Sequence, residues 1–168
     1  AGLRGDRSSV TSRLTIAVCY SRPLFTAFDE RDARTLIEFG RAAGHDVEAL
    51  TLPTSSAEGT FPEHDALCWA LIDLIEVGQR AVDVVVCMDP ATMLLRHPNK
   101  VAWIRNHWSR SITDSLALAG RVVLAEGFTT DAIEADDGSS SPMVVRVRSV
   151  AEVLGVVCAS AEPLRATR

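Results

Sequence analysis

The segment from Asp83 to Arg110 reads DVVVCMDPATMLLRHPNKVAWIRNHWSR. It contains two short apolar runs, Val84 to Met88 and Val101 to Ile104, and polar or charged residues follow each run directly. Short continuous apolar runs predict strands that are buried on both faces, as in a parallel sheet. In an open parallel sheet, ligands bind beyond the carboxyl ends of the strands. The segment therefore predicts the type of sheet and the edge at which a site lies.

Upstream of this segment, the sequence alternates between predicted strands and helices. Leu14 to Tyr20 is an apolar run followed by a loop from Ser21, and Val47 to Leu52 is a second run, which Pro53 ends. Between these runs, the spacing predicts a helix to about Ala43 with one apolar face. The residues expected on that face are Ala33, Leu36, Ile37 and Gly40.

A second helix is predicted after a capping box formed by Thr60 and Glu63. Gly78 is expected to close it, and Trp69 is expected to lie off its apolar stripe and to pack against a neighbouring element. The residues expected on the stripe are Leu67, Ala70, Leu71, Leu74 and Ile75.

Within and beyond the first segment, the same alternation continues. Asp89 and Pro90 predict the start of a short helix through Leu95. Strands are expected at Arg121–Ala125, Met143–Val147 and Val153–Cys158, and helices at Ile112–Ala119 and Thr129–Ala135. The pattern predicts an α/β fold, in which a flexible N-terminal segment (residues 1–13) precedes a single Rossmann-like domain (residues 14–168). Its parallel sheet is expected to have helices on both faces.

Composition narrows the classes of function. The 168 residues carry a formal net charge of -5, which argues against a nucleic-acid partner bound through phosphates. No apolar run approaches the roughly 20 residues of a membrane-spanning helix, and residues 1–13 lack the apolar centre of a secretory signal. We therefore expect a cytoplasmic protein without an integral membrane segment. The four scattered cysteines are expected to be reduced core residues.

Familiar catalytic fingerprints are absent from the sequence. It contains no Gly-x-Gly-x-x-Gly, no phosphate-binding Gly-x-x-x-x-Gly-Lys loop and no Gly-x-Ser-x-Gly elbow. No histidines or cysteines have metal-ligand spacing, so neither a metal nor a cofactor is expected.

The chemistry that remains lies at the predicted strand ends. Ser21 follows the first strand, Asp89 follows the strand in the central segment, and Asn106 and Arg110 follow the next one. Such side chains can bind hydroxyls and anionic groups, although Asp89 is also a natural helix cap. His107 lies in the same region, where an imidazole can bind a sugar hydroxyl or polarise a reacting group.

The run LLRHPNKVAWI, from Leu94 to Ile104, resembles the N-terminal domain of family-4 glycosyltransferases, which have the two-domain GT-B fold. The GHDVE run from Gly44 to Glu48 resembles a second feature of that family. The resemblance covers about residues 14–125. It implies one half of a GT-B architecture, which shapes the acceptor side of a sugar transfer. The match with the family's His-Gln-His-Arg run makes His107 the active-site histidine, with Arg110 supporting it.

The resemblance also implies what must complete the enzyme. The family moves a sugar from a nucleotide-sugar donor, a co-substrate, to an acceptor hydroxyl, and a second domain holds the donor. This chain is therefore expected to bind the sugar acceptor and to be inactive without a donor-binding domain or chain.

Two departures from the family pattern leave an alternative open. The family's Gly-Gly-x-Glu turn corresponds here to Thr26–Glu30, which contains no glycine, and Ser109 replaces a motif histidine. A Cβ in that turn would obstruct the approach of backbone to substrate. The alternative is a degenerate, non-catalytic relative that serves as a binding or scaffolding subunit. An unrelated flavodoxin-like or nucleotide-binding domain is a third possibility.

Overall fold

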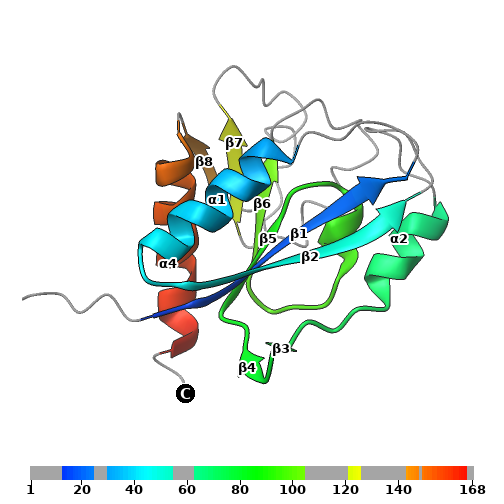
Figure 1. The fold of residues 1–168 in the computed structure, drawn as a ribbon, viewed down its shortest axis with the longest axis horizontal. Helices are drawn as coiled ribbons and strands as arrows, with labels where there is room; N and C mark the ends of the chain where they lie inside the picture. Colours follow the sequence, from blue (N-terminus) through cyan, green and yellow to red (C-terminus); the bar gives the residue numbers. More distant parts are fainter. Residues whose placement is uncertain are drawn as a thin grey trace, which may run out of the picture.

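The computed structural model describes residues 13–24, 30–54, 63–104, 121–125, 143–147 and 149–165. Six strands form one sheet: β1 (Thr15–Pro23), β2 (Asp46–Thr54), β5 (Val84–Cys87), β6 (Lys100–Ile104), β7 (Arg121–Ala125) and β8 (Met143–Val147). Their order is β2-β1-β5-β6-β7-β8, and every neighbouring pair is parallel (Figure 1). The predicted parallel α/β sheet is confirmed.

The helical elements are α1 (Arg31–Ala42), α2 (Glu63–Ala70), a 3-10 helix η1 (Ala91–Leu94) and α4 (Val150–Arg165). In Figure 1, α1 and α4 lie next to each other over the sheet, and α2 lies near the far ends of β1 and β2. The expected flexible segment lies outside the described residues except for Arg13, and so do the helices expected at residues 112–119 and 129–135.

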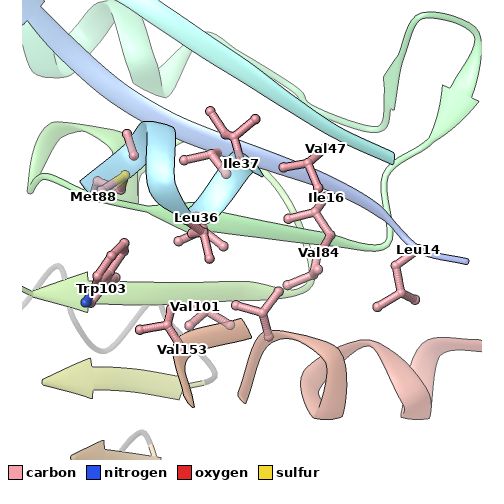
Figure 2. Close-up of a cluster of buried hydrophobic side chains, with 14 of the residues drawn as sticks. Leu14, Ile16, Leu36, Ile37, Val47, Val84, Met88, Val101, Trp103 and Val153 are labelled. Carbon is pink, nitrogen blue, oxygen red and sulfur yellow. The ribbon is translucent and has the colours of Figure 1, made fainter. Parts of the chain in front are cut away.

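One buried cluster joins β1 to α1 and α4. In β1 its members alternate, as the two-residue period of a strand requires: Ile16, Val18 and Tyr20. Figure 2 shows this cluster, in which Leu36 and Ile37 of α1 approach the side chains of the strands. All four residues predicted for the buried face of α1 are buried: Ala33, Leu36, Ile37 and Gly40.

A second buried cluster contains the intervening residues of β1, Ala17 and Cys19. Trp69 of α2 and Met93 of η1 belong to it, with relative exposures of 1% and 0%. Trp69 is thus buried against neighbouring elements, as predicted.

Gly40 brings α1 close to β2. A Cβ at this position would lie 2.6 Å from Val47 Cγ2, closer than two non-bonded carbon atoms approach in proteins. Val47 is β-branched with a stiff χ1, and it is 2% exposed, so it has little room to move.

We expect Gly40→Ala to lower the free energy of unfolding by about 1–3 kcal/mol because the overlap outweighs alanine's gain in helix propensity of about 1 kcal/mol. Gly155→Ala is the matched control, since a Cβ at this α4 position meets nothing within 4 Å. The control should be neutral or stabilising by up to about 1 kcal/mol. Urea unfolding of both variants measures the difference, and equal effects of the two would contradict the close packing.

Strand β2 is longer than predicted and contains Pro53 in its interior. Asp46 N donates to Leu14 O at 2.7 Å, and Thr54 O accepts from Leu24 N at 2.9 Å, so the even-numbered residues of β2 point their backbone groups toward β1. The odd-numbered residues point theirs away from β1. Pro53 therefore lacks an N–H only on the side away from β1, which explains why it does not end the strand.

The prediction for the second helix is wrong in its extent and in its buried face. Helix α2 ends at Ala70, and Leu67, Leu71 and Ile75 are exposed by 64%, 80% and 62%. After the helix, Leu74 N donates to Arg96 O at 3.0 Å, and Arg96 N donates to Ile72 O at 2.8 Å. These backbone bonds replace further helical turns. Leu74 is buried as expected, but it lies beyond the helix and shares its core cluster with Trp69.

Gly78 does not close a helix but forms the turn of a hairpin between β3 (Glu76–Val77) and β4 (Arg80–Ala81). Its φ is 56° and that of Gln79 is 66°. Two central residues with positive φ are typical of a type I′ turn, in which glycine and asparagine are preferred.

Gln79→Gly is expected to stabilise the protein by about 0.5–1 kcal/mol because a left-handed conformation costs glutamine about 1 kcal/mol and costs glycine little. Gly78→Ala should act in the opposite direction by a similar amount. Thermal unfolding of the two variants checks the signs, and a loss of stability in Gln79→Gly would contradict the turn assignment.

The strand predicted at Val153–Cys158 is instead part of helix α4. Val153, Val157 and Ala161 are fully buried and lie four residues apart, so they form one face of the helix. The β-branched residues of this run favoured a strand locally, but packing of this face against the sheet determines the outcome.

The cysteines are free thiols, as predicted, but they are not all core residues. Cys19 and Cys87 are fully buried, whereas Cys68 is exposed and Cys158 is half-buried. Burial raises the pKa of Cys87 to about 12 and that of Cys19 well above its usual value.

Candidate functional site at the carboxyl edge of the sheet

The strand order reverses at β1, which lies between β2 and β5. The chain leaves β1 for β2 on one side and then crosses to β5 on the other side. In open α/β sheets this topological switch point leaves a crevice outside the carboxyl ends of the two strands, where ligands bind. Two of the predicted site residues lie there: Ser21 in β1, and Asp89 just after β5.

Ser21 and Asp89 are in direct contact. Ser21 N donates to Asp89 Oδ2 at 2.5 Å, and Trp69 Nε1 donates to Ser21 Oγ at 2.9 Å. Ser21 was expected in a loop, but β1 continues to Pro23, and this extension carries Ser21 to the position facing Asp89. Trp69 was not predicted as part of this network. The spacing of residues along a helix does not indicate which side chain of a neighbouring strand an indole N–H will contact.

Asp89 also holds the start of η1. Its Oδ1 accepts from Thr92 N at 3.1 Å, and Thr92 Oγ1 donates to the backbone oxygen of Asp89 at 2.6 Å. The predicted capping role is therefore present. Burial raises the pKa of Asp89, and the N–H groups of Ser21 and Thr92 partly oppose that rise because they stabilise the carboxylate.

Internal contacts hold the carboxylate of Asp89 in one orientation. Besides the N–H groups of Ser21 and Thr92, the side chain of Ser21 and the N–H of Ala91 stabilise its charged form and lower its pKa. A carboxylate offers about four acceptor positions, so a ligand hydroxyl at the carboxyl edge would have to share one of them or displace an internal donor.

A charged group of side chains lies on the other face of β1 from Ser21, toward α1. Arg22 Nε lies 3.2 Å from Glu30 Oε1, and Arg34 Nη2 lies 4.0 Å from Glu30 Oε2. Both arginine side chains are largely exposed, so these ion pairs add little stability. Tyr20 lies on the opposite face of β1 from Ser21, and its pKa is raised by burial and, secondarily, by Glu30.

The three remaining predicted site residues, Asn106, His107 and Arg110, lie outside the described residues. They follow β6, and β6 is the parallel neighbour of β5. Among the described residues, no group of three or more potential ligands is arranged to hold a metal ion. No helix of the described part of the chain is both long enough and apolar enough to cross a membrane.

The RHPNK run lies away from this site, at the amino end of β6. Asn99 Nδ2 donates to Asp83 O at 2.9 Å and to Ser160 O at 3.0 Å. These two bonds connect the amino end of β5 to α4. Lys100 Nζ donates to Met93 O at 2.7 Å and to Leu95 O at 3.1 Å, and burial lowers the pKa of Lys100. This run therefore connects η1, the sheet and α4.

His97 belongs to the same structural run. Its Nδ1 lies 2.8 Å from Asn99 O and its Nε2 lies 3.3 Å from Val82 O, so the ring holds the turn before β6. An open groove of about 410 Å³ lies beside this turn. Its lining residues are Asp73, Ile75, Val82, Arg96, His97 and Pro98.

Comparisons with protein-family models, with curated proteins and with solved structures gave no match.

Proposed function

We propose that this chain is the acceptor-side domain of a cytoplasmic glycosyltransferase. In this proposal it is a single Rossmann-like domain with helices on both faces of its sheet, one half of a GT-B architecture. A donor-binding domain or chain would hold the nucleotide sugar, and the two together would move the sugar to an acceptor hydroxyl. The observation that carries the proposal is the contact of Ser21 with Asp89 at the switch point of a parallel sheet.

The strand order is compatible with this proposal. A Rossmann sheet has the order 3-2-1-4-5-6, and removal of its outermost strand leaves β1 between β2 and the strands that follow, as observed here. Flavodoxin-like sheets share this arrangement and also bind their ligand at the switch point. The strand order therefore supports the position of the site at the switch point. That the activity is sugar transfer is inferred from the resemblance around the RHPNK run.

The proposed chemistry assigns a role to each predicted residue. Asp89 accepts hydrogen bonds from acceptor hydroxyls, and Ser21 holds this carboxylate in place. Asn106 and Arg110 bind hydroxyl and anionic groups of the substrates. His107 contacts the reacting hydroxyl as the catalytic residue and polarises it while the bond between sugar and nucleotide breaks.

The proposal is tested by reconstitution with a donor-binding domain. We expect the isolated chain to turn over no nucleotide sugar and the reconstituted pair to transfer sugar. His107→Ala should then reduce transfer by about 100-fold or more, as expected for the loss of a general acid–base group. His64→Ala is the matched control, since His64 in α2 has no assigned role, and it should leave transfer unchanged.

The alternative is a non-catalytic binding or scaffolding subunit. The saturation of Ser21 and Asp89 with internal hydrogen bonds favours it, as these contacts serve the fold without any substrate. The same reconstitution separates the two functions. Formation of a complex whose transfer is unaffected by His107→Ala would support the scaffold and contradict the catalytic assignment.

A further inference from the structure

Cys158 and His45 form a thiol–imidazole pair far from the candidate site in the sequence and in the fold. Cys158 lies in the middle of α4, and His45 lies in the turn between α1 and β2, at the amino end of β2. Cys158 Sγ is 3.3 Å from His45 Nε2. The proposed function uses neither residue.

The hydrogen bonds of His45 assign its proton. Leu14 N donates to His45 Nδ1 at 3.3 Å, and a ring nitrogen that accepts from an N–H carries no proton of its own. The proton of the neutral imidazole is therefore on Nε2, where it is directed at Cys158 Sγ. His45 is 6% exposed, so the surrounding protein holds the ring in this orientation.

This arrangement favours the reactive form of the thiol. A hydrogen bond from an N–H group stabilises a thiolate more than a neutral thiol, and the thiolate is the nucleophile. Cys158 is half-buried at the border of the first core cluster, whereas Cys19 and Cys87 are fully enclosed. Cys68 is exposed but has no comparable contact among the described residues.

We propose that Cys158 is a modification site for peroxides, with His45 as the residue that positions and activates its sulfur. The thiolate attacks one oxygen of hydrogen peroxide, the O–O bond breaks, and hydroxide leaves. Sulfur is oxidised by two electrons to a sulfenic acid, the peroxide is reduced, and the hydroxide takes the proton that the thiol released, which gives water. The Nε2–H of His45 remains bonded to the modified group.

The test compares each thiol of the full chain in its native and urea-unfolded states. Hydrogen peroxide is the reagent, dimedone traps the sulfenic acid, and peptide mass spectrometry gives the rate at each cysteine. The native-to-unfolded rate ratio should be about three to ten at Cys158, about one at Cys68 and far below one at Cys19 and Cys87. A ratio below one at Cys158 would overturn the proposal.

The role of His45 is tested in His45→Phe, which should bring the ratio at Cys158 below one and leave that at Cys68 unchanged. An unchanged ratio at Cys158 in a folded variant would exclude His45 as the activating residue. If His45→Phe does not fold, His45→Asn gives the same test. Its shorter side chain keeps a polar acceptor near Leu14 N but does not reach the sulfur.

Discussion

Trp69→Ala should lower the free energy of unfolding by about 3–5 kcal/mol, the usual cost of removing a buried tryptophan. The indole is 1% exposed and packs in the second core cluster, and its Nε1–H is the donor to Ser21 Oγ. The substitution therefore leaves a cavity and removes a hydrogen bond at the carboxyl ends of the strands. The measurement is urea unfolding followed by circular dichroism.

Two controls separate the effects of Trp69. Trp69→Phe retains most of the buried ring but loses the donor, so it should cost only about 1–2 kcal/mol. Leu71→Ala removes an exposed side chain and should change stability by no more than about 0.5 kcal/mol. A large loss in Leu71→Ala would restore the leucine stripe that the sequence predicted and contradict the observed end of α2.

Asp89→Ala should lower the free energy of unfolding by about 2–4 kcal/mol. The carboxylate accepts from the backbone N–H groups of Ser21 and Thr92, and its removal leaves the donors of half-buried Ser21 and fully buried Thr92 without this acceptor. Each such donor costs about 1–3 kcal/mol. Denaturant unfolding measures the loss, and the exposed Glu38 of α1 provides the control Glu38→Ala, which should be close to neutral.

Asp89→Asn tests which acceptor matters. The amide retains one oxygen, which can accept from Thr92 N or from Ser21 N, while its NH₂ group faces the other donor. We therefore expect a stability between those of the wild type and Asp89→Ala. Equal stability of Asp89→Asn and the wild type would show that one of the two contacts contributes nothing.

The sequence predicted best those elements that local pattern determines. The buried face of α1 follows from a regular helical period, and the continuous apolar run Val84–Cys87 forms a fully buried strand, as its pattern predicted. After α1 the backbone takes a positive φ of 90° at Gly44, which glycine adopts at little cost because it has no Cβ. In these places the local preference and the tertiary packing agree.

Prediction failed where packing opposed the local preference. The valines of α4 favour a strand, but Val153 and Val157 pack, at four-residue spacing, in the core cluster that also contains residues of α1 and β1. The end of α2 at Ala70 depends on backbone bonds to Arg96, which is 26 residues away in the sequence. No periodicity within a short window contains information about such a distant partner.

The candidate site was predicted in part. Ligands bind beyond the carboxyl ends of the strands in an open parallel sheet, and this rule placed Ser21 and Asp89 at the same edge of the sheet. The structure brings the two residues into contact. The rule does not give the order of the strands, so the adjacency of β1 and β5 could not be derived. The involvement of Trp69 could not be derived either, since it depends on how an adjacent helix packs on the ends of both strands.

The outer side of β2 has a consequence for self-association. Arg41 Nε and Nη2 donate to Val47 O at 3.0 Å and 2.7 Å, so this carbonyl already has partners, and Pro53 has no N–H to offer. An edge strand with free backbone groups is a template on which another chain can add a strand. In β2, Arg41 occupies the outward carbonyl of Val47 near one end, and Pro53 offers no N–H near the other. The outward backbone groups of Ala49 and Thr51 between them are too few to align a long partner strand. Among the residues that the structure describes, the same arginine and proline therefore make this edge of the sheet a poor template for another strand.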